Sequence, residues 1–452
     1  MELLIIIVFI IGYLSITLEH TFKIDKLIPA LAMMAIMWAI VALGHLDVFN
    51  VDTALRVLVP SHLEEILLHH LGKTSEILIF LIGAMTIVEI IDYFNGFSTI
   101  KGFIKTKNKT KLLWTISFLA FVLSAIIDNL TATIVLISIL RKLMKNREDR
   151  IWYASIIVIA ANAGGAWSPI GDVTTTMLWI ANKVSVEQLV LHLFIPSLVA
   201  MVIPSAIASF LPAFKGNLSD VDDEEVEKSD KFSAIMLYLG LGAIIFVPIF
   251  KSVTHLPPYI GMMLSLSVVA VFAEIFSSRK FTLTALHEES NKTHHNGPIL
   301  TSLSKIEMPS ILFFLGILMA VAALESLGFL FQFANWLQTT TPMIGTELAT
   351  ATISDLVIIL LGGASAIIDN VPLVAASIGM FPNLIDDPIW HFIAYAAGTG
   401  GSMLIIGSAA GVVAMGMEKI NFFWYLKNFT GLVFIGYIAG ALTFMLMRLV
   451  LN

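Results

Sequence analysis

The residues best suited to chemistry form a short motif that occurs twice. Residues 124–130 read SAIIDNL and residues 365–371 read SAIIDNV, roughly half of the 452-residue chain apart. Each copy, called the SAIIDN motif below, places an aspartate and an asparagine in apolar surroundings. A charged side chain at the centre of a membrane helix costs about 2.5–3.5 kcal/mol on insertion scales, so Asp128 and Asp369 are functional candidates. An acidic motif present twice in an apolar chain indicates an internally duplicated membrane transporter.

A glycine-rich stretch follows each SAIIDN motif. Residues 162–172 read NAGGAWSPIGD, and residues 398–408 read GTGGSMLIIGS at the matching place in the second half. Glycine loosens a helix and proline removes a backbone donor, so we expect each stretch to split a membrane span into two half-helices. Asp172 has Ser408 as its counterpart. We therefore expect the first half to carry more of the chemistry than the second.

These motifs and stretches would supply ligands that contain only oxygen. Carboxylates, amide oxygens, hydroxyls and carbonyls suit a hard cation such as Na⁺ or Li⁺, and the motifs contain no lysine or arginine for an anion. The candidate ion-binding residues are Asp128, Asn129, Thr131, Asn162, Ser168, Asp172, Thr174, Thr175, Ser365, Asp369, Asn370, Thr399, Ser402 and Ser408. The expected Na⁺ ligands among them are Asp128, Asn129, Asn162, Asp172, Asp369 and Asn370. We expect no catalytic residue and no cofactor.

A carboxylate that binds Na⁺ can bind H⁺ instead, and each ion then expels the other. A protein in which the two ions compete for one aspartate exchanges them across the membrane. Asp128 and Asp369 are the expected places for this competition. Glu89, Asp92 and Glu325 also lie in apolar spans, either as accessory proton-handling groups or as residues with a packing or interfacial role.

The composition is that of a membrane protein. Hydrophobic residues make up 58% and charged residues 13% of the chain, against roughly 25% charged residues in a soluble domain. Long apolar runs with weak alternation predict helices, because backbone in lipid must satisfy its own hydrogen bonds. The chain has no cysteine, which excludes disulfides and thiolate metal sites. No basic, aromatic-rich patch suggests a nucleic acid partner.

Charge patterning predicts the topology. Basic residues flank 112–140 on both sides, and basic loops lie in the cytoplasm, so this segment should enter and leave on one face as a re-entrant hairpin. The flanks of 350–381 contain no lysine or arginine, so this second hairpin should enter from outside. We predict an all-α polytopic protein with inverted repeats, two re-entrant hairpins, two broken helices and about ten full crossings.

The expected organisation has four parts. The first part contains N-terminal scaffold helices (1–73), and the second is a first repeat (74–214) with its hairpin (112–140) and broken helix (151–181). The third part is a connection (215–308) with an acidic linker, scaffold helices and a polar loop. The fourth is a second repeat (309–452) with its hairpin (350–381) and broken helix (388–416). Residues 46–73 are expected to be an interfacial, partly helical connection, and the third span to cover roughly 74–97.

Residues 83–96, 124–133, 162–175 and 365–373 resemble the NhaD-type sodium/proton antiporters of bacteria, part of the ion transporter superfamily. The resemblance implies electrogenic exchange of cytoplasmic Na⁺ or Li⁺ for external H⁺ at alkaline pH, serving sodium and pH homeostasis. It implies a homodimer in the bacterial inner membrane, working by alternating access of the elevator type. The positions that match cation-handling residues of the family are Asp128, Asn129, Asn162, Asp172, Thr174, Thr175, Ser365, Asp369 and Asn370.

Two alternatives remain open. The superfamily also includes anion carriers for arsenite efflux or dicarboxylate/sodium symport, but its carboxylate symporters carry Ser-Asn-Thr where this chain has Asp-Asn at each tip. An intramembrane aspartyl protease would use Asp128 and Asp369 as two acids sharing a proton. Interruptions rather than two intact helices flank the motifs, which disfavours the protease.

Overall fold

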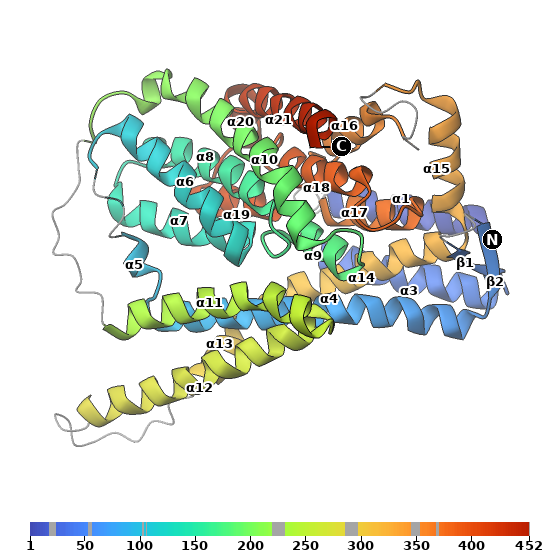
Figure 1. The fold of residues 1–452 in the computed structure, drawn as a ribbon, viewed down its shortest axis with the longest axis horizontal. Helices are drawn as coiled ribbons and strands as arrows, with labels where there is room; N and C mark the ends of the chain where they lie inside the picture. The colour runs from blue at the N-terminus through green and yellow to red at the C-terminus, as the bar shows by residue number, and fades with distance from the viewer. Residues whose placement is uncertain are drawn as a thin grey trace.

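A computed structural model describes residues 1–17, 24–52, 57–101, 104, 106–218, 231–284, 297–344, 353–367 and 370–451 (Figure 1). Most of the acidic linker and part of the polar loop that follows α12 lie outside these ranges. The first part of the chain contains α1 (Glu2–Thr17), α3 (Leu27–Leu43), β1 (Val48–Asp52), β2 (Val57–Ser61), α4 (Leu63–Tyr93) and α5 (Ser98–Lys101). It continues with α6 (Lys109–Ile127), α7 (Asn129–Leu143), α8 (Arg147–Gly165), α9 (Val173–Ile180), α10 (Val186–Ser209) and a 3-10 turn (Pro212–Phe214).

The second part is also helical. It contains α11 (Lys231–Thr254), α12 (Pro258–Thr284), α13 (Pro298–Lys305), α14 (Met308–Ser326) and α15 (Phe329–Thr340). It ends with α16 (Asp355–Ala364), α17 (Asn370–Met380), α18 (Pro388–Gly400), α19 (Ala409–Glu418), α20 (Phe422–Asn428) and α21 (Thr430–Leu451). The interruptions predicted within residues 162–172 and 398–408 are present, because α8 and α9, and likewise α18 and α19, are separate helices.

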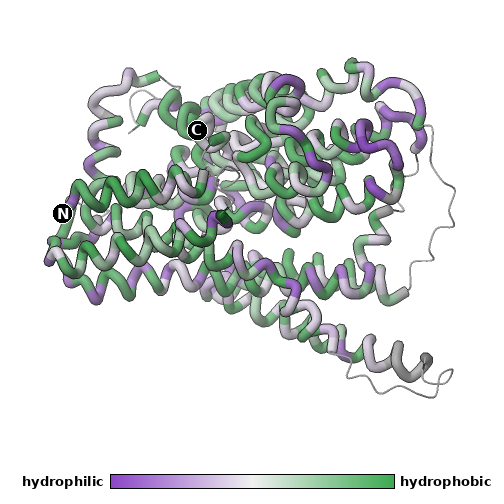
Figure 2. Tube along the Cα trace, turned by 180° about the vertical axis from the view of Figure 1, so that it is seen from behind, coloured by the Kyte–Doolittle hydropathy of each residue, from purple (hydrophilic) through white to green (hydrophobic). Residues whose placement is uncertain are grey.

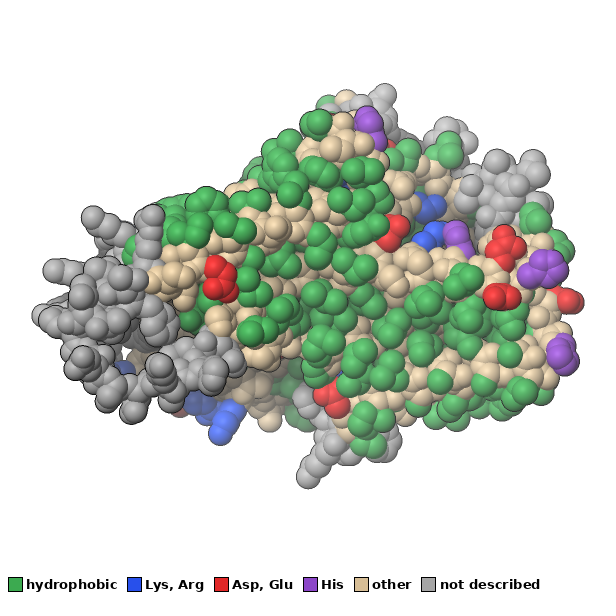
Figure 3. Space-filling view, turned by 90° about the horizontal axis from the view of Figure 1, so that it is seen from below, with side chains coloured by type: hydrophobic (Ala, Val, Ile, Leu, Met, Phe, Trp, Pro, Cys, Tyr) green, Lys and Arg blue, Asp and Glu red, His purple; other side chains and the backbone are tan. Residues whose placement is uncertain are grey.

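Seven of the described helices are long and apolar enough to cross a membrane: α4, α6, α10, α11, α12, α14 and α21. Figure 2 shows hydrophobic residues along most of the helical trace. The face seen from below in Figure 3 is largely hydrophobic, with charged side chains confined to a few places. Exposed Phe246, Ile249, Val271 and Phe272 on α11 and α12 are suited to lipid. The protein is a multi-pass helical membrane protein, and the count of ten crossings stays a prediction.

The helices form two packed groups (Figure 1). The group that we call the α4 layer contains α3, α4, α11, α12 and α14, and within it α14 packs on α3 and α12 packs on α4. The group that we call the α8 bundle contains α6–α10 and α16–α21, and within it α6 packs on α8 and α10 packs on α21. The bulky side chains of Trp179, Trp390 and Tyr395 are fully buried in or against the bundle.

The prediction for residues 46–97 needs correction. The chain forms an antiparallel β-hairpin there, with Val48 opposite Ser61 and Asp52 opposite Val57, so the fold is not purely α-helical. The valines and Phe49 favour this extended pairing. α4 then runs from Leu63 to Tyr93 without a break. The helical part expected within 46–73 is thus the beginning of this helix, which starts before the predicted span of 74–97.

The two halves make equivalent contacts around the SAIIDN motifs. Ser124 Oγ donates to Ala161 O at 2.6 Å, and Ser365 Oγ donates to Ala397 O at 3.0 Å. Each serine thereby ties the helix that leads into the motif to the first half of a broken helix, α8 or α18. The sequence similarity between the halves therefore extends to the same hydrogen bond at the same place.

A buried carboxylate joins the halves at the end of the bundle that carries the basic loops. Glu418, at the end of α19, accepts hydrogen bonds from Arg141 Nε at 2.7 Å and Arg150 Nε at 3.1 Å, and its side chain is 1% exposed. Arg147 donates to the main-chain oxygens of Glu418 and Lys419 at the same helix end. The arginines of α7–α8 thus fix the position of α19.

Glu418→Ala should destabilise the protein by roughly 2 kcal/mol, because it removes a buried carboxylate that accepts charged hydrogen bonds from the half-buried Arg150 and the exposed Arg141. The measurement is the temperature of half-unfolding in detergent. Glu187→Ala removes an exposed glutamate from the first turn of α10 and should change stability by no more than about 0.5 kcal/mol. Equal midpoints for the two variants would contradict a structural role for Glu418.

Candidate functional site

Asp172 occupies the start of α9, directly after the unwound stretch that ends α8. Its backbone is extended (φ −147°, ψ 148°), and its carboxylate Oδ1 accepts a hydrogen bond from Thr174 N at 3.0 Å. Aspartate is a preferred residue at this position because it satisfies a free amide of the first helical turn. The side chain is buried. A carboxylate is thus fixed inside the protein where a membrane helix is interrupted.

The asparagines of both SAIIDN motifs converge on Asp172. Asn129 Nδ2 donates to Asp172 Oδ2 at 2.8 Å, and Asn370 Nδ2 donates to the same oxygen at 3.1 Å. All three residues are buried. The two motifs, distant in the sequence, therefore meet at one carboxylate from the first broken helix.

The hydrogen-bond network continues from Asn129 into the second broken helix. Asn129 Nδ2 also donates to Asn162 Oδ1 at 3.0 Å, and Asn162 Nδ2 donates to Ser408 Oγ at 2.8 Å. Ser408 accepts from Gly411 N at 3.2 Å at the start of α19, just as Asp172 accepts from Thr174 N at the start of α9. The counterpart positions thus play the same capping role, and only the first half has a charge there.

Asp128 lies at the junction of α6 and α7 and points to its own helix. Thr131 N donates to Oδ1 at 2.8 Å, and Thr131 Oγ1 donates to Oδ2 at 2.9 Å. The backbone of Asp128 has φ 73° and ψ 158°, a conformation normally left to glycine that costs of the order of 1–3 kcal/mol. A strained acidic residue at a helix break is a feature of functional sites.

Asp128, Asn129, Asp172 and Asn370 line one cavity. It has a volume of about 890 Å³ including its open part, and it lies between the α4 layer and the α8 bundle. Its further lining residues are Lys26, Phe80, Leu81, Ala84, Met85, Val88, Ile126, Ile127, Leu130, Ile170, Val173, Thr176, Ile244, Met262, Ser310, Phe314, Val371 and Ala409. Most of these are apolar. The acids and amides therefore form a small polar region against hydrophobic walls.

The side chains of this region offer oxygen ligands, which suit a hard cation. Within the described ranges, no cluster of three or more acidic, histidine or cysteine side chains is present. A cation held here would rely on one or two carboxylates, with amide, hydroxyl and backbone oxygens for the rest. Such ligands suit a hard, exchangeable ion.

Comparisons with known proteins identify the family. A family model described as "Citrate transporter" matches residues 4–392. The chain is 42% identical over 443 residues to Sodium/proton antiporter 1 of Arabidopsis thaliana, covering 96% of this chain and 70% of that protein. It is 39% identical over 447 residues to Sodium/proton antiporter 2 of the same plant, covering 97% and 98%. It is 31% identical over 452 residues to the Na(+)/H(+) antiporter NhaD of Alkalimonas amylolytica, covering 96% and 88%. The chain belongs to the NhaD-type sodium/proton antiporter family. The family resemblance inferred from the motifs is thereby confirmed.

In this NhaD-type chain, several candidate residues support the interrupted helices rather than the centre of the network. Thr175 Oγ1 donates to Asp172 O at 2.9 Å, Ser168 Oγ lies 3.4 Å from Ile170 N, and Thr399 Oγ1 donates to Tyr395 O at 2.6 Å. Ser402 Oγ donates to Thr399 O at 2.6 Å. Ser365 and Thr131 make the bonds given above, and the Thr174 hydroxyl is buried without a hydrogen-bond partner.

Glu89, Asp92 and Glu325 lie apart from this network. Asp92 is exposed in the last turn of α4, and Glu89 is half-buried one turn earlier. Glu325 lies near the end of α14 against Gly379 of α17, where its carboxylate would contact any added side chain. Asp369 lies outside the described residues, so its role stays a prediction.

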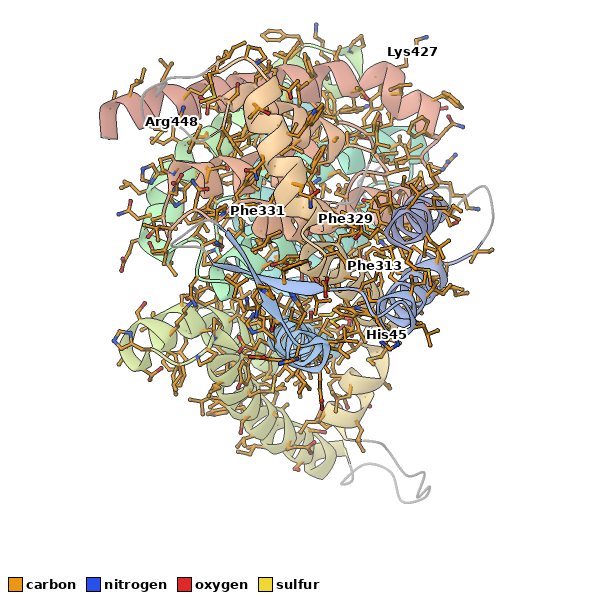
Figure 4. All side chains as sticks on the ribbon, turned by 90° about the vertical axis from the view of Figure 1, so that its right-hand side faces the viewer. His45, Phe313, Phe329, Phe331, Lys427 and Arg448 are labelled. Carbon is orange, nitrogen blue, oxygen red and sulfur yellow. The ribbon has the colours of Figure 1, made fainter. Side chains whose placement is uncertain are left out.

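Lys26, Ser310 and Thr176 line the cavity of this NhaD-type protein but were not among the candidates. Lys26 directly precedes α3, and Ser310 lies in the first turn of α14. Lys26 Nζ lies 4.5 Å from the centre of the Phe313 ring, and Figure 4 labels Phe313. Single lysines and serines at helix ends carry no sequence signal. Thr176 follows Thr174 and Thr175, and its hydroxyl donates to Pro169 O at 2.9 Å.

Proposed function

We propose that this protein is a secondary active transporter that exchanges Na⁺ or Li⁺ for H⁺. The observation that carries the proposal is the hydrogen bonding of Asn129 and Asn370, one from each SAIIDN motif, to the buried Asp172 carboxylate. The names of the plant and bacterial relatives give two of these ions, Na⁺ and H⁺. No enzymatic step and no cofactor is part of the proposal.

Exchange follows from competition between the two ions for carboxylates that line one cavity. Na⁺, as substrate, would take oxygens of Asp128 and Asp172, and amide oxygens of Asn129, Asn162 and Asn370 after their side chains rotate. A proton arriving at the same carboxylate would remove the charge that holds Na⁺. Because either ion excludes the other, each step of the cycle carries one of them across the membrane.

The proposed cycle is alternating access of an inverted-repeat protein. The α6–α7 and α16–α17 segments would be the two re-entrant hairpins, and α8–α9 and α18–α19 the two broken helices. The equivalent bonds of Ser124 and Ser365 support this duplication. Movement of the α8 bundle against the α4 layer, as an elevator, would open the cavity to either side of the membrane.

The membrane and the oligomeric state are part of the proposal. Both plant and bacterial relatives match almost the whole chain, and we propose a bacterial cell membrane from the resemblance to the NhaD-type proteins. A homodimer is proposed on the same ground. The partners are thus small inorganic cations, lipid and a second copy of the chain.

Anion transport is a second candidate, because the matching family model is described as a citrate transporter. Lys26 is a positive charge that lines the cavity. The acids of the site argue against this candidate, since Asp128 and Asp172 would repel a carboxylate substrate. Uptake of citrate by proteoliposomes that fail to exchange Na⁺ for H⁺ would favour the anion carrier.

Everted membrane vesicles test the proposed exchange. Addition of Na⁺ should collapse a preformed ΔpH when the wild-type protein is present, and the Asp128→Asn variant should lose most of this response because the neutral side chain binds neither ion well. Asp47→Asn, which changes an exposed aspartate before β1, should respond like the wild type. A wild-type protein without a Na⁺-dependent response would overturn the proposal.

A further inference from the structure

Lys251 connects the α4 layer to the α8 bundle. It contacts the C-terminal end of α9, the helix whose N-terminus is capped by Asp172. Lys251 lies in the last turn of α11, in the α4 layer, whereas α9 belongs to the α8 bundle. The ammonium Nζ donates to Trp179 O at 3.0 Å and to Asn182 Oδ1 at 3.2 Å. One cation thus binds both a main-chain oxygen and a side-chain oxygen at the C-terminal end of α9.

The C-terminal end of α9 has a backbone conformation and partial charges that favour a bound cation. Asn182 has a left-handed backbone (φ 52°), and its N–H donates to Trp179 O at 3.1 Å, while Lys183 N donates to Leu178 O at 2.8 Å. This arrangement closes the helix in the usual way with an asparagine in the left-handed position. A positive charge at such an end is favourable because the last carbonyl groups carry partial negative charge.

The α4 layer also holds the ring of Trp179. Lys251 Nζ lies 4.7 Å from the centre of this ring, and Phe80 of α4 packs against it edge to face at 6.3 Å between ring centres. Trp179 is 1% exposed. Phe80 also lines the cavity that contains Asp172. The end of α9 is therefore fixed from outside its own bundle by two side chains.

Because α9 is short, a displacement of its C-terminal end also displaces Asp172 at its start. The helix has eight residues, Val173–Ile180, and Asp172 caps its start. A helix of this length spans about 12 Å, so a shift at Trp179 moves the whole segment, including the Asp172 carboxylate. The Asn129 and Asn370 contacts then change with it.

We propose that Lys251 is a positioning residue for ion exchange: it holds Asp172 in place through α9 in this conformation, and its contact with α9 opens in each transport cycle. This inference rests on the proposed function and adds a residue outside the ion-binding network. It predicts that loss of the cation weakens the apparent affinity for Na⁺. It also predicts that a permanent link between α11 and α9 stops exchange.

Lys251→Met tests the positioning role in everted vesicles. The half-saturating Na⁺ concentration should rise roughly fivefold, as expected for the loss of a charged hydrogen bond at a helix end, while the rate at saturating Na⁺ stays within about twofold. Lys251→Arg, which keeps the positive charge, should show the half-saturating Na⁺ concentration of the wild type. Lys427→Met is the matched control, because Lys427 lies in the last turn of α20, in the α8 bundle and at the top of Figure 4. A folded Lys251→Met protein with the wild-type half-saturating concentration would overturn the inference.

A cross-link tests the opening of the contact, and it does not depend on how Lys251→Met folds. The chain has no cysteine, so Lys251→Cys with Asn182→Cys gives a single reactive pair. Bridging the pair with a cleavable bis-methanethiosulfonate reagent should stop exchange, and reduction should restore the rate measured before bridging. Full exchange by the bridged protein would contradict the inference. Failure of the wild type to exchange Na⁺ for H⁺ would instead contradict the proposed function.

Discussion

Asp172→Asn is expected to abolish exchange in vesicles while the protein remains folded. The substitution keeps the shape of the side chain but removes the charge that Asn129 and Asn370 contact. Removing this charge takes away a Na⁺ ligand, and a loss of about 2.7 kcal/mol in the free energy of Na⁺ binding corresponds to a reduction of exchange by roughly 100-fold. The effect should be larger than that of Asp128→Asn, because Asp128 contacts its own helix and Asp172 joins both halves.

The measurement is the Na⁺-dependent collapse of ΔpH at several Na⁺ concentrations, with equal amounts of protein confirmed in each membrane preparation. Asp47→Asn serves as the control for an aspartate elsewhere. Retention of more than about one tenth of wild-type exchange by Asp172→Asn would contradict the role given to this carboxylate. An equal loss in Asp128→Asn and Asp172→Asn would contradict the larger contribution predicted for Asp172.

Gly164→Ala and Gly400→Ala are each expected to destabilise the protein strongly. A methyl group on Gly164 would lie closer than 3.0 Å to the main-chain oxygen of Phe121, and one on Gly400 would lie equally close to that of Gly362. Because these neighbours are backbone atoms, the helices must separate, which we expect to cost about 3 kcal/mol. Both variants should yield little folded protein after extraction.

The controls are Gly242→Ala and Gly416→Ala, where an added methyl group meets nothing within 4 Å. Both lie within helices, so alanine should leave stability unchanged or raise it by up to about 1 kcal/mol. Thermal unfolding in detergent compares all four variants. Because Gly164 and Gly400 occupy equivalent places in the halves, a loss in only one of them would contradict the structural equivalence of the broken helices.

Much of the site could be predicted because its residues are polar, charged or glycine, and such residues are conspicuous in apolar membrane segments. Charged residues and glycine-rich stretches are rare in membrane helices, so the SAIIDN motifs and residues 162–172 stood out. The breaks near Gly164 and Gly400 follow from local backbone chemistry, which the sequence carries directly. Asn129 and Asn370 were expected to belong to one set of Na⁺ ligands, but the sequence did not indicate that both would donate to Asp172.

The central position of Asp172 could not be read from the motifs. Asp128 is the acid that is part of the first motif, but its carboxylate caps α7 through Thr131. Which acid faces the opposite half depends on side-chain orientation at the helix breaks. The sequence offered one hint, the charge of Asp172 against the neutral Ser408, and this hint favoured the first half.

The extent of α4 and the contact of Lys251 depend on packing between distant segments. The beginning of α4 is polar, so hydropathy places the span too late, although the helix continues through His69 and His70. Lys251 ends an ordinary apolar span, and nothing in its neighbourhood indicates that it binds Trp179 and Asn182. Such residues become visible only when the two helix groups are placed together.

The competition of Na⁺ and H⁺ at Asp172 is tested most directly by counting protons released when Na⁺ binds. Purified protein in a weakly buffered detergent solution at constant ionic strength receives NaCl or choline chloride, and a pH dye reports the release. The wild type and Asp47→Asn should release protons with Na⁺ only, and Asp172→Asn should release none. Proton release by Asp172→Asn equal to that of the wild type at the same Na⁺ concentration would contradict the account.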